Sequence, residues 1–418
     1  MPDPDRQTQI AQLEGTPERD FYTGSDLSRV QAVADLRART HKLMPRFVLE
    51  YLEAGAEDEA TLSRERTAFA EWRFVPRQLV DVSGRSLETD ILGRPAKLPL
   101  AIAPTGLNGL FMHHADTALA QAAARVGVPF TQSTMSNDHM DEVAKVEGLR
   151  HWWQLYVFGG DEVWQELLRR ADAAGCEALL LTTNAQIFGD RTWSQRTRIA
   201  GTVPDLSDMV NAAAHPRWFA GSLAHGMPSF PNVIDFVPKD QQSFFAATHW
   251  IRSQMPESLS WDTVAKIRDR WKKPFLLKGL LHPDDVRRAL DSGVDGVVLG
   301  THGGRQQDWA VSALDVLPEV VRIVRGRMAV MMSGGIRRGT DLLKAYALGA
   351  DAVLAGRAPL YGLCAGGADG VARALQILHD EAQEDMGLMG AAHLHDLGPE
   401  LLASISRVAF PGGRRGAG

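Results

Sequence analysis

The chain has 418 residues, of which 44% are hydrophobic and 23% are charged, a composition typical of a globular protein with a large buried core. Its 45 basic and 51 acidic residues give a formal net charge of −6, so we expect no nucleic acid partner. The two cysteines, Cys176 and Cys364, have no metal-ligand spacing around them, which argues against a disulfide framework and a metal site and favours a reducing compartment. With neither a signal-peptide pattern nor an apolar run long enough to span a bilayer, we expect a cytoplasmic protein.

The N-terminal part of the chain is predicted to lie outside the main domain. Residues 1–24 are polar and are expected to form a poorly ordered tail. Residues 25–97 form an extension: apolar residues recur at three- and four-residue spacing up to about residue 60, which predicts helices, and Pro45 is expected to start the second of them. Residues 73–97 are expected to be irregular or short β structure that leads into the main domain.

From residue 98 to residue 402 one unit repeats: a short apolar run, a turn and an amphipathic segment. The apolar runs are Leu98 to Pro104, Pro129 to Thr134, His151 to Val157, Ala178 to Asn184, Pro274 to Gly279, Gly296 to Thr301, Met328 to Gly334 and Ala352 to Arg357. Eight alternating strand–helix units predict an α/β fold of the TIM (β/α)8 barrel type, because parallel strands need crossover connections and eight strands close the sheet. A doubly wound open sheet is the alternative. Residues 403–418 are expected to be a C-terminal tail.

The long connection after the fourth strand breaks this rhythm. Within it, residues 201–258 are rich in Pro, Gly, Ser and aromatic residues. A connection of this length is typical of a lid or a binding segment. We therefore predict a lid or insert, with a small satellite core of its aromatic side chains as an equal alternative.

The loop after the sixth strand brings a histidine and an arginine together. His302 and Arg305 are separated by Gly303 and Gly304, which allow a tight turn. A titratable base beside a permanently charged guanidinium group suits a site that binds a carboxylate. A solvated loop with a structural histidine is the alternative.

Polar or glycine-rich residues end all eight predicted strands, so we expect a site at the C-terminal mouth of the barrel. The turns after strands seven and eight combine glycines with Arg337 and Arg357, which predicts a phosphate site. Since no Walker-type loop and no dinucleotide G-x-G-x-x-G follows any strand, a mononucleotide phosphate is favoured over an NTP or NAD.

The motifs Ala103-Pro104-Thr105, Gln154-Leu155-Tyr156, Lys278-Gly279, His302 to Gln306 and Gly334 to Gly339 occur in this order along the chain. Together they resemble the FMN-dependent α-hydroxy-acid oxidase and dehydrogenase family, over a range from about Leu27 to about Leu402. The resemblance implies FMN as the cofactor and a small-molecule L-2-hydroxy acid as the substrate.

The resemblance also implies residue roles. His302 is expected to be the catalytic base, Arg305 and Arg191 to bind the substrate carboxylate, and Tyr51 and Tyr156 to orient the substrate. Lys278 is expected beside the flavin, where its ammonium stabilises the negative charge that arrives on reduction. The implied cofactor-binding positions are Pro104, Thr105, Gly106, Ser133, Gln154, Thr182, Lys278, Ser333, Gly334, Gly335, Arg337, Gly356 and Arg357.

The residues after Pro104-Thr105 and the segment 224–228 are most similar to mandelate dehydrogenases. Gly106 is expected to leave room above the flavin, which favours a bulky or aromatic acid. In those relatives the connection after strand four attaches the enzyme to a membrane; here the charged residues within 201–258 favour a soluble lid, with membrane contact as the alternative. Relatives often form tetramers, so a homotetramer is expected, while oxygen, a quinone and a carrier protein remain open as electron acceptors.

Three departures from the family pattern stand near the predicted site. Gly300-Thr301 replaces Ser-Asn before the histidine, and Ser333 and Asn184 each replace an aspartate. Loss of the aspartate that pairs with a catalytic histidine costs about 10⁴ in rate in Ser-His-Asp enzymes. Either another acid such as Asp190 or Asp308 substitutes, or the chain performs altered chemistry on this scaffold, or it is a flavin-binding protein with little turnover.

Overall fold

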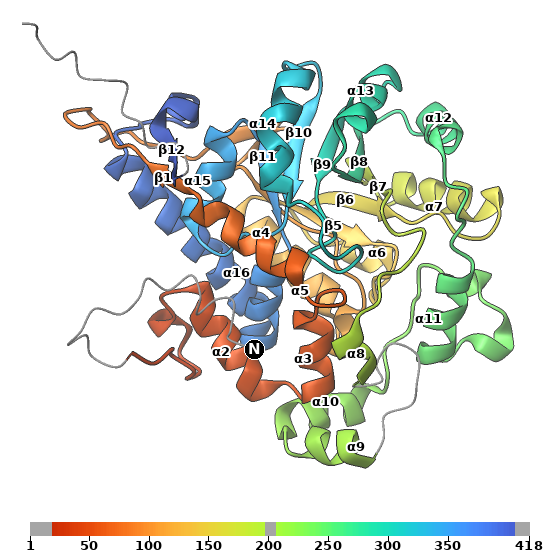
Figure 1. The fold of residues 1–418 in the computed structure, drawn as a ribbon. Coiled ribbons are helices and arrows are strands. Elements are labelled where there is room, and N and C mark those ends of the chain that lie inside the picture. Colours follow the sequence, from red (N-terminus) through yellow and green to blue (C-terminus); the bar gives the residue numbers. More distant parts are fainter. Residues whose placement is uncertain (1–18, 197–205, 406–418) are drawn as a thin grey trace, which may run out of the picture.

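The structure is a computed structural model, and it describes residues 19–196 and 206–405 (Figure 1). Most of the two predicted tails, 1–24 and 403–418, and the first residues of the predicted insert 201–258 lie outside the described residues.

Eight parallel strands close into a barrel in the order β4, β5, β6, β7, β8, β9, β10 and β11, with β11 paired to β4 (Figure 1). Their bounds are β4 (Leu100–Ile102), β5 (Pro129–Ser133), β6 (Arg150–Leu155), β7 (Ala178–Thr182), β8 (Phe275–Leu280), β9 (Gly296–Leu299), β10 (Ala329–Ser333) and β11 (Ala352–Ala355). Each strand overlaps one of the predicted apolar runs. The prediction of a TIM barrel is confirmed, and the open-sheet alternative is wrong because the sheet closes.

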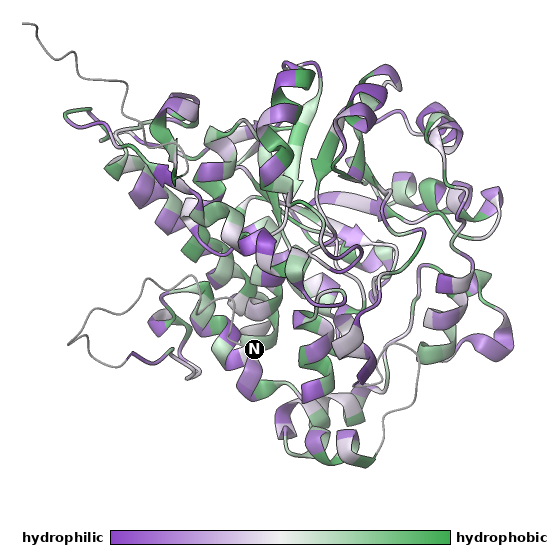
Figure 2. Cartoon of the chain, viewed as in Figure 1, coloured by the Kyte–Doolittle hydropathy of each residue, from purple (hydrophilic) through white to green (hydrophobic). Residues whose placement is uncertain are grey.

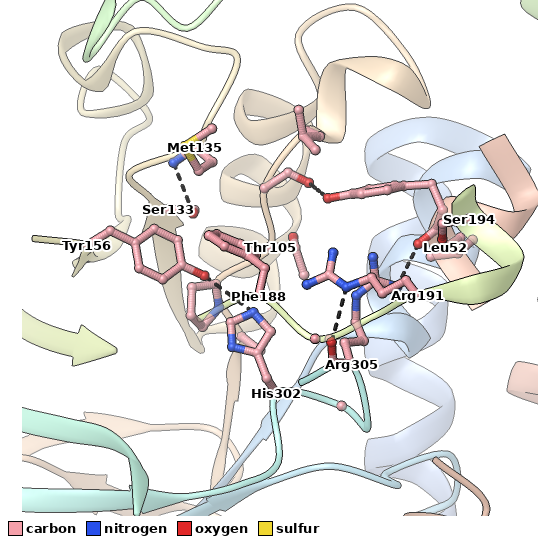
Figure 3. A pocket seen from close by; sticks show the side chains of 18 of the residues that line it. Leu52, Thr105, Ser133, Met135, Tyr156, Phe188, Arg191, Ser194, His302 and Arg305 are labelled. Carbon is pink, nitrogen blue, oxygen red and sulfur yellow. Dashed lines mark hydrogen bonds between the residues drawn. The ribbon is translucent and has the colours of Figure 1, made fainter. Parts of the chain in front are cut away.

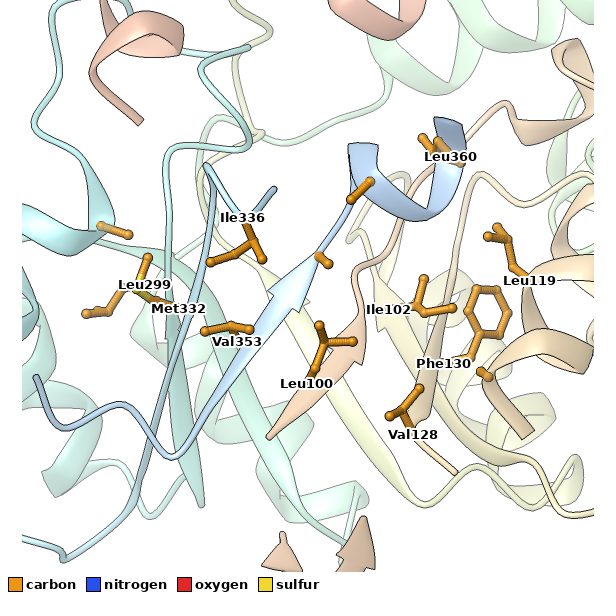
Figure 4. Close-up of a cluster of buried hydrophobic side chains, with 14 of the residues drawn as sticks. Leu100, Ile102, Leu119, Val128, Phe130, Leu299, Met332, Ile336, Val353 and Leu360 are labelled. Atoms are coloured by element: carbon orange, nitrogen blue, oxygen red, sulfur yellow. The ribbon is translucent and has the colours of Figure 1, made fainter. Parts of the chain in front are cut away.

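Side chains on both faces of the strands are buried, which explains the continuous apolar runs. On β4, Leu100 and Ile102 belong to the core between the strands and the outer helices (Figure 4), and the intervening Ala101 belongs to a smaller cluster with Trp152 and Met331 inside the barrel. Burial of each such large apolar side chain contributes roughly 1.5–3 kcal/mol. The two-sided burial therefore supplies a rigid frame for the strand ends.

Helices surround the barrel and turn polar faces outward (Figure 2). Those that follow the strands are α5 (Ala115–Val126), α6 (Met140–Val143), α7 (Asp161–Ala173), α12 (Trp261–Arg270), α13 (Pro283–Asp291), α14 (Ala313–Val324), α15 (Gly339–Ala347) and α16 (Arg357–Leu388). Short 3-10 helices are η2 (Asn108–Leu110), η5 (Leu394–Asp396) and η6 (Pro399–Leu401).

The N-terminal extension is helical up to residue 70, about ten residues beyond the predicted limit, and then forms short β structure. Its helices are η1 (Leu27–Arg29), α2 (Val33–Leu43), α3 (Arg46–Glu53) and α4 (Ala60–Ala70), and Pro45 caps α3. β1 (Trp72–Phe74) pairs with β12 (Leu402–Ser404), and β2 (Thr89–Ile91) pairs with β3 (Arg94–Ala96). Arg357 fixes the end of α3, because its guanidinium donates hydrogen bonds to the carbonyls of Leu52, Glu53 and Ala54. The extension is thereby tied to the mouth of the barrel.

The connection after β7 forms helices rather than an irregular loop. They are α8 (Thr192–Arg196), α9 (Leu206–Ala213), α10 (Pro216–His225), η3 (Ile234–Phe236), η4 (Lys239–Gln241) and α11 (Phe244–Ser253). The rings of Phe230 and Phe244 stack with centroids 5.4 Å apart, and Trp250 packs edge-on against Phe158. These aromatic side chains therefore pack as part of the core that surrounds the barrel and do not form a separate satellite core.

No helix within residues 19–196 and 206–405 is both long enough and apolar enough to cross a bilayer. Helices α9 and α10 nevertheless expose several large apolar side chains, namely Leu206, Met209, Val210 and Leu223.

Candidate active site

A cavity of 730 Å³ opens at the C-terminal ends of the strands, where the sequence predicts the site. The predicted residues that line it are Tyr51, Pro104, Thr105, Gly106, Ser133, Tyr156, Arg191, Lys278, His302, Arg305, Ser333, Gly334, Gly335, Arg337, Gly356 and Arg357. Gln154, Thr182 and Asn184 do not line it. Gln154 touches its wall, since Ser133 Oγ donates to Gln154 Oε1 at 2.9 Å, and Thr182 is buried beside Lys278 in the β7–β8 register.

The His302 ring points toward the Tyr156 hydroxyl (Figure 3), and its other nitrogen faces Asn184. Its Nε2 lies 3.3 Å from the Tyr156 hydroxyl, and its Nδ1 lies 3.4 Å from Asn184 Oδ1. The Asn184 amide is oriented by Gly300, whose carbonyl accepts from Asn184 Nδ2 at 3.2 Å. Because Oδ1 then faces the ring, it accepts from Nδ1–H, and the lone pair of Nε2 faces the Tyr156 hydroxyl. Asn184 thus keeps the tautomer suited to a base but supplies no charge.

The surroundings of His302 favour the neutral ring. Burial and the charges of Lys278, Arg191, Arg305 and Arg357 hold the pKa of His302 well below its usual value. The carboxylates proposed as substitutes do not contact it. Asp308 accepts backbone hydrogen bonds from residues 58, 60 and 61, and the structure shows no bond from the exposed side chain of Asp190 to the ring.

Two arginines lie side by side at the same end of the cavity (Figure 3). Arg305 Nη1 donates to the carbonyls of Tyr51 and Ala54, and Arg191 Nε donates to the carbonyl of Arg305 at 3.1 Å. Among the described residues no carboxylate pairs with either guanidinium, and burial together with Arg191 lowers the pKa of Arg305 well below its usual value. Two buried cations in contact with neutral groups form a site for an anion.

A second part of the cavity wall, here called the cofactor end, carries or adjoins buried polar groups without partners among the described residues. Thr105 Oγ1, Gln154 Nε2 and Arg337 Nε have no hydrogen-bond partner among the described residues. Gly334 and Gly335 both have positive φ, which lets the backbone turn against the cavity wall. Such unmatched donors and acceptors beside a glycine turn and an arginine fit FMN. Arg357, predicted as a phosphate ligand, lines the cavity and also donates hydrogen bonds to the carbonyls of residues 52, 53, 54 and 303.

Sequence reasoning missed the outer wall of the cavity. Met135 and Phe188 line it, and α11 contributes Arg252, whose guanidinium lies 4.4 Å from the centre of the Phe188 ring. These residues belong to no motif, and only the aromatic content of the long connection pointed to it. A Cβ on Gly106 would lie 2.7 Å from Met135 Cβ, so Met135 packs against that glycine on the side toward which a side chain would project.

Comparisons with known proteins agree with this geometry. A family model described as FMN-dependent dehydrogenase matches residues 40–404. The (S)-mandelate dehydrogenase of Pseudomonas putida is 39% identical over 371 residues, which cover 88% of this chain and 93% of that protein. An L-lactate dehydrogenase of Chromohalobacter salexigens is 35% identical over 391 residues, covering 91% and 99%. The crystal structure of the monotopic membrane protein (S)-mandelate dehydrogenase superposes with a TM-score of 0.86 and 38% identity, covering 90% of this chain and all of that one.

Proposed function

The chain belongs to the FMN-dependent dehydrogenase family, and from that premise we propose that it oxidises an L-2-hydroxy acid with a bulky or aromatic side chain to the 2-oxo acid. FMN, when bound, accepts the two electrons that leave the substrate. The observation that carries the proposal is the convergence of His302 with Arg191 and Arg305 at one end of the cavity.

In this proposal the arginine pair anchors the substrate. The N–H groups that Arg305 and Arg191 do not use on carbonyl and amide oxygens are available to the substrate carboxylate. A carboxylate there neutralises two buried cations and fixes the orientation of the 2-hydroxyl group.

His302 Nε2 takes the proton from the anchored substrate. The ring is neutral because its pKa is low, so it is ready to accept a proton throughout the neutral range. The Tyr156 hydroxyl, 3.3 Å from Nε2, is placed to orient the substrate hydroxyl. Tyr51 donates its own hydroxyl hydrogen to the Gly106 carbonyl at 2.9 Å, so it can only accept from a substrate.

The apolar side chains in the cavity wall support a bulky substrate. They include Leu107, Phe111, Met135, Phe188, Ile251 and Met255. An aromatic ring placed among them loses contact with water, whereas the methyl group of lactate would leave part of that wall unfilled. Both an aromatic acid and lactate occur in the names of the relatives, which include an (S)-mandelate dehydrogenase and an L-lactate dehydrogenase.

We expect kcat/KM for (S)-mandelate to exceed that for L-lactate by at least about tenfold, since burial of a phenyl group contributes more than 1.4 kcal/mol. Steady-state assays of both enantiomers of each acid, with an artificial electron acceptor, measure this ratio. Higher specificity for lactate would contradict the proposed substrate class while leaving the reaction type intact.

We predict that N184D raises the rate of flavin reduction by at least about tenfold. A base must be neutral to accept a proton, so activity falls as pH drops through the pKa of His302. A carboxylate beside Nδ1 raises that pKa, so the acid limb of the pH profile of N184D should move to higher pH, with faster reduction above it. N184A removes Oδ1 without adding charge and should slow reduction. An unmoved limb in N184D would show that this position does not act on His302.

A second candidate function is altered chemistry on the same scaffold. It is favoured by Asn184, which adds no charge beside the histidine, and by Ser333, whose hydroxyl donates to the Leu299 carbonyl at 3.3 Å. A protein that binds flavin but is reduced by no 2-hydroxy acid would support this candidate or a flavin-binding role with little turnover.

We further propose that the protein works in the cytoplasm as a homotetramer. The exposed apolar side chains of α9 and α10 are the surface that would contact either a neighbouring subunit or a membrane. Oxygen, a quinone and a carrier protein are the candidate electron acceptors.

A further inference from the structure

Glu65 on α4 carries a buried carboxylate with incomplete bonding. Its side chain is 2% exposed. Oε1 accepts a hydrogen bond from Thr301 Oγ1 at 2.5 Å, whereas Oε2 is buried and has no partner among the described residues. An unmatched carboxylate oxygen in the interior is costly, so its position requires a nearby cation or donor.

This carboxylate lies directly behind the glycine turn of the cofactor end. A Cβ on Gly334 would overlap Glu65 Oε2, and a Cβ on Gly335 would overlap the Glu65 carbonyl oxygen. Both glycines line the cavity. Glu65 therefore packs directly against this turn, on the side toward which a Cβ of either glycine would project.

Glu65 is the carboxylate whose charge acts on Lys278, and it also interacts with the charge of Arg357. Lys278, Thr301 and Gly334 lie on or just after the neighbouring strands β8, β9 and β10. The structure shows no hydrogen bond from the buried Lys278 ammonium to any described residue. Burial raises the pKa of Glu65 to about 7, while the hydrogen bond from Thr301 and the charges of Arg357 and, less strongly, Lys278 oppose this shift and Asp315 adds to it. Burial lowers the pKa of Lys278 to about 8, and the charge of Glu65 opposes that shift.

The neighbouring serine cannot supply this charge. Ser333 Oγ donates to the Leu299 carbonyl, and a Cβ on Gly300 would overlap it, so the hydroxyl is confined beside the end of β9. Apart from Glu257, which is exposed, no acidic side chain is among the described residues that line the cavity.

We propose that Glu65 is a positioning residue for the cofactor: its carboxylate balances the charge of Lys278 and supports the Gly334–Gly335 turn, and so supplies from α4 the negative charge that Ser333 lacks. It acts through Lys278 and the turn and does not touch the reacting atoms. The proposal rests on FMN binding and is independent of which acid is oxidised.

The test is E65Q, which keeps an oxygen for Thr301 but removes the charge. The affinity for FMN is measured between pH 6 and pH 9 by diluting the holoenzyme and recording the flavin fluorescence that recovers as FMN is released. Because Glu65 raises the pKa of Lys278, the ammonium of E65Q loses its proton at lower pH. The alkaline loss of affinity should begin about one pH unit lower than in the wild type, which corresponds to about tenfold weaker binding near pH 8.

A second variant moves the carboxylate from position 65 to position 333 and tests the proposal more directly. S333D should restore the pH dependence when combined with E65Q, because it returns a negative charge to the same turn. On its own it should weaken FMN binding, because two carboxylates would then face each other across Gly334. Additive effects of E65Q and S333D would overturn the proposal, as would an E65Q variant with the pH dependence of the wild type.

Two controls separate charge from folding. E381Q changes another partly buried glutamate, which accepts from the Gly339 amide at 2.8 Å and pairs with Arg338 but does not line the cavity; it should leave FMN release unchanged. T301V removes the hydrogen bond that lowers the pKa of Glu65 but keeps the carboxylate, so it should move the alkaline loss of affinity in the same direction as E65Q but by less. An unmoved T301V profile at a lowered melting temperature would show that Glu65 has only a structural role.

Discussion

H302Q is expected to slow the reduction of bound flavin by substrate by roughly 10²- to 10⁴-fold. Glutamine retains a polar amide, but it cannot accept a proton near neutral pH. The flavin itself should stay bound, because the unmatched polar groups at the cofactor end are unchanged. Rapid mixing without oxygen, with the visible flavin absorbance as the signal, measures the rate.

Backbone strain needs its own control in this experiment. His302 has a φ of 60°, a left-handed conformation that asparagine adopts more readily than glutamine. H302N should therefore lose the rate to the same extent while keeping the melting temperature of the wild type. Retained reduction in both variants would remove His302 from the role of base.

R305K is expected to lower kcat/KM by roughly 10- to 100-fold, since one charge-assisted hydrogen bond is worth about 1.5–3 kcal/mol. The Arg305 guanidinium reaches two carbonyls through Nη1 and still presents other N–H groups to the cavity. A lysine ammonium is a single point charge and cannot donate to the two carbonyls and to the substrate carboxylate at the same time. Steady-state kinetics with (S)-mandelate measure the loss, and thermal unfolding reports any damage to the α3 contact.

Chemical rescue distinguishes anchoring from general damage. Free guanidinium ion added to R305A should restore part of the rate, because it fits the space left by the side chain and binds a carboxylate in the same planar way. Ammonium ion at the same ionic strength should restore much less. Equal rescue by the two ions, or no rescue with an intact fold, would contradict a bidentate anchor at this position.

The barrel could be predicted because its signal is local. Strands buried on both faces produce continuous apolar runs such as Gly296 to Leu299, and the helices between them show their own periodicity. The inner part of the cavity could be predicted equally well, because each strand ends in polar or glycine residues and the strand ends meet at one mouth of a parallel barrel.

Contacts between distant segments could not be predicted. Arg357 is a predicted phosphate ligand by its place after strand eight, but that place does not show that its guanidinium also binds the carbonyls at the end of α3, about 300 positions away in the chain. Glu65 belongs to no sequence motif, and only the fold brings it to Thr301 and Gly334. Met135 likewise fills the space beside Gly106 from another strand end.

Anaerobic mixing of the flavin-loaded protein with (S)-mandelate, (R)-mandelate, L-lactate and D-lactate, followed by the absorbance of the oxidised flavin, tests the proposed reaction most directly. We predict rapid bleaching by (S)-mandelate, slower bleaching by L-lactate and none by the opposite enantiomers. A flavin that stays oxidised with all four acids would contradict oxidation of a bulky L-2-hydroxy acid by this site.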